Sequence, residues 1–406
     1  MCRFLACVIL ISCSLDHYGQ IIADHTVVDR FDDIPQYYID EVKKMWLTVP
    51  GESHSEVYRV GLTLLESVNS KFQVNVTESG TPEGYTDQHL RASRAMYVGG
   101  WLYNYGEEEW FTNSTGIGYT RGSIDYCSTH NLEISAIGFG WCWDDTYDDP
   151  SATTDPVFGC RWYGGSMGGP EGPKPWGLDA ADFAITGNSI CMDTYLSVTQ
   201  GYSDYCKSKG YKTRVFFTTG PVETHYTPGE AGYQGSIKHQ YIRDYVKKDP
   251  GRILFDYADI LCWNDNGVQT TATWNAHTFP IITATNLGDA SIGHIGSAGA
   301  IRLAKAMWWM LARMAGWDGG ITGFEDPSVE ESEIWTEVKE SELKVHLPGD
   351  LLSGKSHLYA LDGSLKASIQ NDSDLISFDT SNLSSGLYIL VIRYSAGSKT
   401  KKIILP

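Results

Sequence analysis

Short apolar runs alternate with helix-like segments through most of this chain, and that alternation restricts the fold more than any other feature. The runs occupy residues 44–49, 72–76, 133–139, 213–218 and 252–257. Helical apolar spacing follows the first run and recurs at 192–209, 237–248 and 301–314. A helical stretch is also expected over 87–96, and the polar residues 21–40 are expected to form a strand or loop. Strands separated by helices form right-handed βαβ units, which build a parallel sheet covered on both faces. We therefore expect an α/β fold whose ligands bind beyond the carboxyl ends of the strands.

Length and charge limit the possible partners. The chain has 406 residues, enough for one large domain and a small one. Hydrophobic residues make up 42% of it, and aromatic residues are frequent, which excludes a disordered protein. The net charge of −19 argues against a nucleic acid or an anionic membrane as the partner.

Residues 1–20 resemble a secretory signal peptide. Arg3 precedes an apolar run over 4–13 that is too short to span a bilayer, and cleavage is expected near Gly19 and Gln20. Lipidation at Cys13 is an alternative. Removing this leader leaves six of the nine cysteines, which is compatible with three disulfides or with buried thiols. We expect no later transmembrane segment, and neither a metal site nor a cofactor, since no Cys/His cluster has zinc spacing.

Residues 140–187 interrupt the alternation with a segment rich in Trp, Gly, Pro and Asp. An irregular insert of this length is often a lid or a cleft wall. Its tryptophans, among them Trp141, Trp143, Trp162 and Trp176, are expected either to stack on sugar rings or to fill the insert's own core.

The last part of the chain changes character. Residues 325–341 read as an acidic linker, and residues 342–406 contain short alternating runs separated by turns, as in a small antiparallel all-β sandwich. A strand ending in Asp362 and Gly363, the segment from Asp379 to Leu390, and a terminal Lys-Lys-Ile-Ile-Leu resemble the C-terminal sorting domain of type IX secretion cargo. The resemblance implies export to the cell surface or beyond, with the secretion machinery as a partner. A carbohydrate-binding β-module is the alternative.

The first apolar run ends in Gly51-Glu52-Ser53, and Val57, Val60, Leu64 and Leu65 then fall on one helical face. This strand–turn–helix resembles the first block of SGNH (GDSL-like) hydrolases, with Glu52 in place of the usual Asp. The resemblance implies a flavodoxin-like three-layer sandwich over residues 21–324 and acyl-ester chemistry with Ser53 as nucleophile. Alternatively, Ser53 only caps the helix, or the neighbouring His54 or Ser55 is the functional residue.

The other blocks of that family match less closely. Gly84 is the best candidate for the glycine after the second strand, with Gly80 and the pair Gly99 and Gly100 as competitors. The asparagine of the third block is missing from residues 138–145. An indole N–H of Trp141 or Trp143, or Asn188 at the end of the insert, is expected to take its place as oxyanion donor.

The last block supplies the proposed base. His294 precedes the final helix, as the family histidine does, and Asp289 lies five residues upstream instead of three. The resemblance implies a Ser53–His294–Asp289 triad, or a Ser–His dyad if a backbone carbonyl orients His294.

The residues favour a secreted serine hydrolase that cleaves acyl esters, with acetyl esters of polysaccharides as a candidate substrate. A Gly-x-Ser-x-Gly elbow at 164–168 is disfavoured because Gly and Pro follow where a helix is needed. Glu223 and His225 follow the fourth apolar run, so we expect their loop to lie at the same edge of the sheet as Ser53, where these side chains could contact the substrate. The alternatives are a polysaccharide lyase or glycosidase, with Asp144, Asp145, Glu223 or Asp256 as carboxylates, and a non-catalytic glycan-binding protein.

Overall fold

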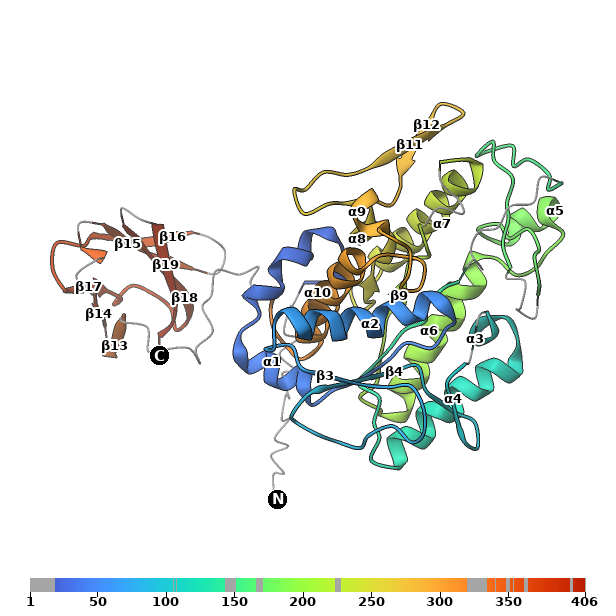
Figure 1. Cartoon of the computed structure of the whole chain (residues 1–406). Coiled ribbons are helices and arrows are strands. Elements are labelled where there is room, and N and C mark those ends of the chain that lie inside the picture. Colours follow the sequence, from blue (N-terminus) through green and yellow to red (C-terminus); the bar gives the residue numbers. More distant parts are fainter. Residues whose placement is uncertain are drawn as a thin grey trace, which may run out of the picture. The chain divides into compact units, whose positions relative to one another are not determined.

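The computed structural model separates the chain into two compact units, Met1–Asp318 and Gly319–Pro406 (Figure 1). It describes residues 19–104, 106, 108–142, 151–165, 171–222, 228–319, 334–339, 341–347, 351–352, 354–360, 364–394 and 397–405. The expected signal peptide up to residue 18 and Cys13 lie outside the described residues.

Parallel strands form the centre of the first unit. Five are ordered β3-β4-β2-β7-β8 and three are ordered β1-β10-β9. Their bounds are β1 Ile22–Ala23, β2 Trp46–Thr48, β3 Val74–Thr77, β4 Leu90–Ser93, β7 Ala136–Ile137, β8 Arg214–Val215, β9 Phe217–Thr218 and β10 Leu254–Phe255. Only Phe216 separates β8 from β9, and its N–H donates to the Ile137 carbonyl (3.0 Å). The two sets therefore continue into one another, and the expected parallel sheet is confirmed.

Side chains of the strands alternate between two hydrophobic clusters. In β2, Trp46 belongs to one cluster and Leu47 to the other, as expected for a strand that is covered on both faces. The Leu47 cluster draws on η1 (His25–Asp33), α1 (Gln36–Lys43), α2 (Ser53–Val68), α8 (Tyr257–Cys262) and α10 (Ser297–Met314). The Trp46 cluster draws on α3 (Glu109–Thr112), α4 (Ser114–Thr129), α6 (Met192–Lys209) and α7 (Glu230–Lys247).

Helices α2 and α10 pack closely against each other (Figure 1). A Cβ atom at Gly61 would lie 2.3 Å from the carbonyl oxygen of Ala300, so only glycine permits this approach. Gly61 lies on the buried stripe of α2, whose other members include Val57, Leu62 and Leu65. The contact joins two helices whose first residues are separated by more than half of the chain.

Shorter elements complete the unit. Hairpins are formed by β5 (Met96–Tyr97) with β6 (Trp101–Leu102) and by β11 (Thr271–Trp274) with β12 (His277–Pro280). The remaining pieces are η2 (Ala180–Asp182), α5 (Phe183–Thr186) and α9 (Ala284–Leu287).

Two local expectations fail in this unit. Residues 87–96 were expected to be helical, but they contain β4, which pairs with β2 and is buried along its whole length. Tertiary contacts explain this, because Arg91 donates to the Lys44 carbonyl and Trp46 donates to the Ser93 hydroxyl. The polar segment after residue 21 was expected to be a strand or loop, and it forms β1, η1 and α1.

Disulfides are not formed. All six cysteines after the leader belong to the described part of the chain and are buried thiols. Burial raises the pKa of the Cys127 and Cys160 thiols to about 12, which keeps them protonated. Cys127, Cys160 and Cys206 act as small apolar side chains in the Trp46 cluster, and Cys262 does so in the Leu47 cluster.

Three tryptophans of the insert are packed inward. Trp141, Trp162 and Trp176 are buried within the Trp46 cluster, so they offer no ring face to a sugar. The expectation of core packing is confirmed for these three. Residues 143–150 and 166–170 of the insert lie outside the described residues.

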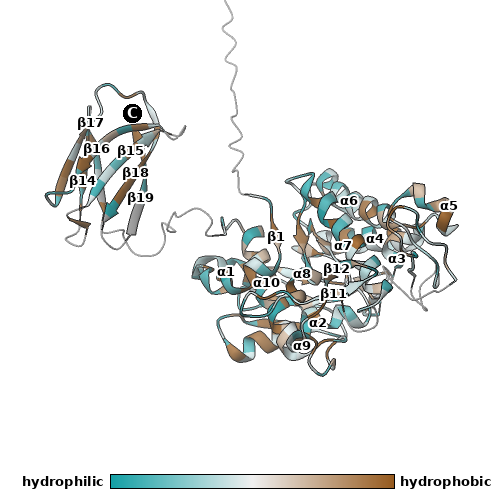
Figure 2. Cartoon of the chain, turned by 90° about the horizontal axis from the view of Figure 1, so that it is seen from above, coloured by the Kyte–Doolittle hydropathy of each residue, from teal (hydrophilic) through white to brown (hydrophobic). Residues whose placement is uncertain are grey.

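The second unit consists of two antiparallel sheets, β13-β14-β17 and β16-β15-β18-β19, which share one core (Figure 2). Their bounds are β13 Trp335–Lys339, β14 Glu342–His346, β15 Lys355–Ala360, β16 Leu365–Gln370, β17 Leu375–Asp379, β18 Gly386–Tyr394 and β19 Gly397–Leu405. Alternate residues such as Leu343, Val345, Leu390 and Ile392 fill this core. The expected all-β tail is confirmed. Part of the expected linker was misassigned, because Trp335–Lys339 pairs with β14 as a strand.

Candidate active site

Ser53 lies on the turn that joins β2 to α2. Beyond β2, Gly51 pairs with Gly140, and a Cβ atom on Gly51 would lie 2.4 Å from the Gly140 carbonyl oxygen. Gly51 also has a φ of +142°, which suits glycine. Ser53 is then the first residue of α2, with Glu52 as its N-cap. A half-buried hydroxyl thus lies at a helix N-terminus, where free N–H groups favour a negative oxygen.

The side chain of His294, 241 positions further along the chain, lies against this hydroxyl. Its Nε2 atom lies 2.9 Å from Ser53 Oγ, within hydrogen-bond distance. A neutral imidazole at this distance can accept the serine proton, the contact that a nucleophile and its general base require. The structure therefore brings Ser53 and His294 together.

A two-residue turn presents His294. Ile292 and Ile295 exchange both of their backbone hydrogen bonds (2.9 and 3.0 Å), and between them Gly293 and His294 have φ angles of +48° and +74°. These are features of a type I′ turn, which requires positive φ at both central residues. A histidine in this region is uncommon, and such backbone strain is often found at functional sites.

The turn also touches the backbone of the nucleophile. A Cβ atom at Gly293 would lie 2.4 Å from the carbonyl oxygen of Ser53 and 3.3 Å from the amide nitrogen of Val57. Gly293 therefore allows the turn to rest directly on the first turn of α2. The approach sets the distance between the imidazole and the serine hydroxyl.

Buried groups hold the loop in place. Ile295 is completely buried, and Gly296 donates from its N–H to the Asn286 carbonyl (3.0 Å). The Asn286 side chain donates to the carbonyls of Leu261 and Trp263, at 2.8 and 3.0 Å. The histidine loop is thus attached to α8 as well as to α2.

Asp289 does not join the pair. It is exposed, and its Oδ1 accepts hydrogen bonds from the N–H and the hydroxyl of Ser291. These bonds lower the pKa of Asp289 and keep it ionised. They also direct the carboxylate to Ser291 instead of His294. The five-residue spacing gives this loop a different geometry from an Asp-x-x-His motif.

Two further residues lie against the pair, and sequence reasoning gave neither of them this role. Cys142 places its Sγ 3.8 Å from Ser53 Oγ. His54 is buried, and its ring centre lies 4.8 Å from that of His294. Cys142 carries no local sequence signal, because it joins the site only through the folding of a distant segment, whereas His54 directly follows Ser53 in the sequence.

The three expected oxyanion donors are placed as follows. Gly84 is exposed and follows Glu83, whose carboxylate contacts Asn75 in β3 and His89 just before β4. Gly84 is therefore beside the amino end of β4, whereas Ser53 follows the carboxyl end of β2. Asn188 is buried, and its Oδ1 accepts from the Ile190 N–H. Trp143 lies outside the described residues.

The indole N–H of Trp141, the other expected donor, already has a hydrogen-bond partner. Trp141 donates from Nε1 to the carbonyl of Thr218 (3.2 Å) and packs edge-on against Tyr195 and Trp110. It anchors the segment that leads to Cys142.

Ser55, the nearby alternative to Ser53, is buried and donates to the Val49 carbonyl (2.5 Å), while Arg59 donates to its hydroxyl. Ser55 is therefore part of the support below the turn. The alternatives Ser166, Asp144, Asp145, Glu223 and His225 all lie outside the described residues.

A small pocket adjoins the site at the carboxyl ends of the strands. It is lined by His54, Tyr58, Trp141, Thr219, Gly220, Pro221 and Tyr257. His54 follows the nucleophile in the chain, and Trp141 precedes Cys142. The pocket is therefore lined by His54, which lies against the Ser53–His294 pair, and by Trp141, the neighbour of Cys142.

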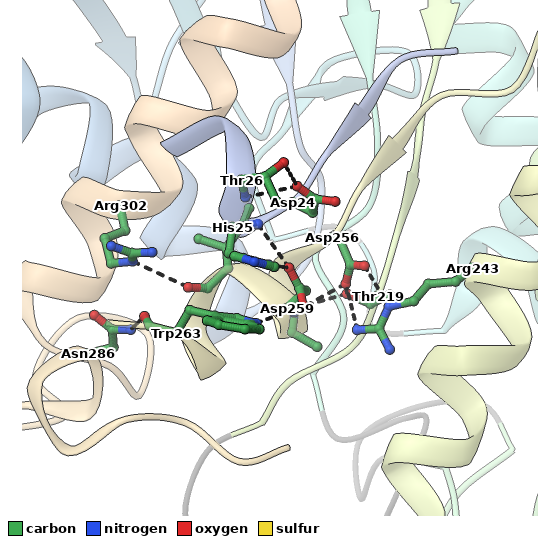
Figure 3. A network of polar contacts seen from close by, with 12 residues as sticks. Asp24, His25, Thr26, Thr219, Arg243, Asp256, Asp259, Trp263, Asn286 and Arg302 are labelled. Atoms are coloured by element: carbon green, nitrogen blue, oxygen red, sulfur yellow. Dashed lines mark hydrogen bonds and ion pairs between the residues drawn. The ribbon is translucent and has the colours of Figure 1, made fainter. Parts of the chain in front are cut away.

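A polar network supports one wall of this pocket (Figure 3). Arg243 of α7 donates twice to Asp256, at 2.6 and 2.9 Å, and Thr219 donates to the same carboxylate (3.0 Å). Burial alone would raise the pKa of Asp256, but the charge and hydrogen bonds of Arg243 keep it below its ordinary value. Asp256 is therefore part of a buried ion pair and is not positioned as a glycosidase carboxylate.

Asp24, His25 and Asp259, which are labelled in Figure 3, bring potential metal-ligand atoms within 4.8 Å of one another. The contacts among them have a structural explanation. His25 bonds to Asp259 through its backbone N–H (2.9 Å) and its Nδ1 (2.5 Å), and it stacks on Trp263. We assign the group the role of attaching the start of the chain to α8.

Comparison with known proteins identifies the tail. Residues 341–406 match the family model of the secretion system C-terminal sorting domain, which confirms the resemblance to type IX cargo. The tail indicates a protein that is secreted or attached to the cell surface, with the secretion machinery as partner. Within the described ranges, no helix is both long enough and apolar enough to cross a membrane.

No match to the first unit gives it a family. The search of curated proteins found no match. Among solved structures, an engineered protein and a Cellulomonas fimi endo-β-1,4-mannanase double mutant are 10% and 11% identical, each with 95% of this chain and 99% of the other covered. Both TM-scores are 0.22, which is too low for the likeness to bear on fold or function.

Proposed function

We propose that the first unit is a secreted serine hydrolase of the SGNH type that cleaves acyl esters. The observation that carries the proposal is the 2.9 Å distance between Ser53 Oγ and His294 Nε2. The hydroxyl belongs to the first residue of a helix and the imidazole to the loop before the last helix of the unit, as in SGNH enzymes.

The strand order supports the same assignment. Apart from the outer strands β1 and β3, the order is β4-β2-β7-β8/β9-β10, so the strands lie as second, first, third, fourth and fifth along the chain. This is the order of flavodoxin-like sheets. We include a flavodoxin-like three-layer sandwich in the proposal, with one hydrophobic cluster in each of the two helix–sheet interfaces.

The proposed reaction has two steps. His294 Nε2 takes the hydroxyl proton while Ser53 Oγ bonds to the ester carbonyl carbon, and the carbonyl electron pair moves to its oxygen. The N–H of Ser53 at the helix start stabilises that oxyanion. Collapse expels the alcohol, which receives the proton from His294. Water, activated by His294, then releases the acid and restores the serine.

The sorting tail supports an extracellular substrate, since it directs the chain out of the cell. Acetyl esters of polysaccharides are the substrate class we favour, because export brings the enzyme into contact with carbohydrate outside the cell. The buried state of the three described tryptophans of the insert gives no support to glycan binding as the sole function.

Hydrolysis of p-nitrophenyl acetate tests the proposal. Ser53→Ala should lower kcat/KM by at least about 10³-fold, as the removal of a nucleophile does in serine hydrolases. Ser291→Ala is the matched control, since its hydroxyl bonds to Asp289 in the histidine loop, and it should retain activity. Asp289→Asn should also remain active.

A fluorophosphonate probe provides a second measurement. Ser53 Oγ should bond to phosphorus with loss of fluoride, and mass spectrometry should find the adduct on the peptide that contains Ser53. Equal activity in wild type and Ser53→Ala, or a label on another residue, would refute the assignment.

A further inference from the structure

We propose that Cys142 is a further catalytic residue whose thiol donates a hydrogen bond to the oxyanion formed at Ser53. This inference rests on the proposed function. The proposed function assigns the oxyanion one donor, the N–H of Ser53, and the asparagine that SGNH enzymes use is missing from residues 138–145.

The distance fits this role. Cys142 Sγ lies 3.8 Å from Ser53 Oγ, and an oxyanion shares the carbon to which that Oγ becomes bonded. The oxyanion and Oγ are then neighbours on one tetrahedral carbon, so the oxyanion forms close to Oγ. Its oxygen falls within reach of a thiol that faces the nucleophile. A thiol is a weak donor, but its strength rises when the acceptor carries a full negative charge.

The chain around Cys142 fixes its position. Gly140 donates from its N–H to the Pro50 carbonyl (2.9 Å), and a Cβ atom there would lie 2.8 Å from the Cα atom of Ser55. The segment therefore crosses directly over the first turn of α2. Next to it, Trp141 is held by its bond to Thr218 and by the surrounding rings. Cys142 thus follows two restrained residues, as a preorganised donor should.

The thiol is also enclosed by the protein. Cys142 is 8% exposed, and it belongs to a segment held by apolar packing. Cys142 Sγ and His294 Nε2 thus both lie against the Ser53 hydroxyl, at 3.8 and 2.9 Å. In this proposal His294 transfers the proton, and Cys142 stabilises the negative charge that develops on the carbonyl oxygen.

Substitutions at Cys142 test the inference with p-nitrophenyl acetate as substrate. Cys142→Ala should lower kcat by about 10-fold with KM little changed, less than the 10²–10³-fold known for a strong oxyanion donor. Cys142→Ser keeps a donor and should recover most of kcat. Cys206→Ala is the control, because that thiol is also buried but lies in α6. It should keep the wild-type kcat.

A tetrahedral analogue provides an independent readout. Methylboronic acid bonds to a serine oxygen and carries a negative charge on boron and its oxygens. Its inhibition constant should rise in Cys142→Ala and return toward the wild-type value in Cys142→Ser. A purely structural role for the thiol does not predict that recovery.

The outcomes separate the two proposals. An unchanged kcat in Cys142→Ala overturns the inference alone, and so does an equal loss in the alanine and serine variants. If the wild-type protein cleaves no ester, both the proposed function and the inference about Cys142 are wrong. Loss in the alanine variant with recovery in the serine variant supports both.

Discussion

Gly293→Ala should separate the base from the nucleophile while leaving both residues in place. The new Cβ would lie 2.4 Å from the Ser53 carbonyl oxygen, and contacts under 3.0 Å are essentially never seen for a Cβ. The turn must therefore retreat by roughly 0.6 Å, and His294 retreats with it. Since a misplacement of about 1 Å costs around 10²-fold in rate, we expect kcat/KM to fall about 10- to 100-fold.

The positive φ adds a separate cost. Alanine at a φ of +48° is destabilised by about 1–2 kcal/mol relative to a residue in the ordinary helical region. Gly210→Ala isolates this cost, because Gly210 has a φ of +71° at the end of α6 and no heavy atom lies within 4 Å of its added Cβ. It should lose a similar free energy of unfolding and keep its esterase activity.

The assay pairs kcat/KM on p-nitrophenyl acetate with urea unfolding of both variants. Lost activity in Gly293→Ala alone, with comparable destabilisation in both, is the expected pattern. Wild-type kcat/KM in a folded Gly293→Ala protein would show that the turn does not set the Ser53–His294 distance, and the reasoning would be wrong.

Two further predictions concern stability and thiols. Arg243→Leu strands the buried carboxylate of Asp256 and should lower the free energy of unfolding at pH 7 by roughly 3–5 kcal/mol in urea titrations. Because the pKa of Asp256 is lowered in the folded protein, its ion pair stabilises the fold above the pKa of the unfolded state, and this stabilisation is lost as pH falls through the folded-state pKa. The difference in unfolding free energy between wild type and Arg243→Leu should therefore shrink in acid. An equal difference at all pH values would contradict this. When protein without the leader is unfolded in denaturant without reductant, a thiol assay should detect six free thiols, and a smaller number would reveal a disulfide. In the native protein, Ellman's reagent at pH 8 should leave the thiols with raised pKa values unmodified: Cys127, Cys160 and Cys206.

The sequence allowed the β2–turn–α2 unit to be predicted because its signals are local. An apolar run, a Gly-acid-Ser turn and a helical stripe follow one another within about 20 residues. His294 was also accessible, since it directly precedes a strongly apolar helix. For both residues the expected role came from the resemblance of a short local block to the SGNH family.

Other features depend on contacts that no local pattern records. In β4, Arg91 and Ser93 break the apolar run, yet both are buried because Lys44 and Trp46 supply their hydrogen-bond partners. Cys142 became a candidate only when its strand end met the first turn of α2. Tertiary partners decided these cases, and they override local propensity.

The close packing at Gly61 has a consequence for when the unit can become active. Ser53 begins one of the two helices that meet there, and His294 lies just before the other, α10, whose Ala300 touches Gly61. A chain growing from its amino terminus carries the serine long before the histidine exists. The nucleophile therefore acquires its base only when α10 has docked, so a partly made or partly unfolded chain has no competent pair. Ester cleavage would then report directly on the completed fold, and its loss on heating should coincide with the release of α10.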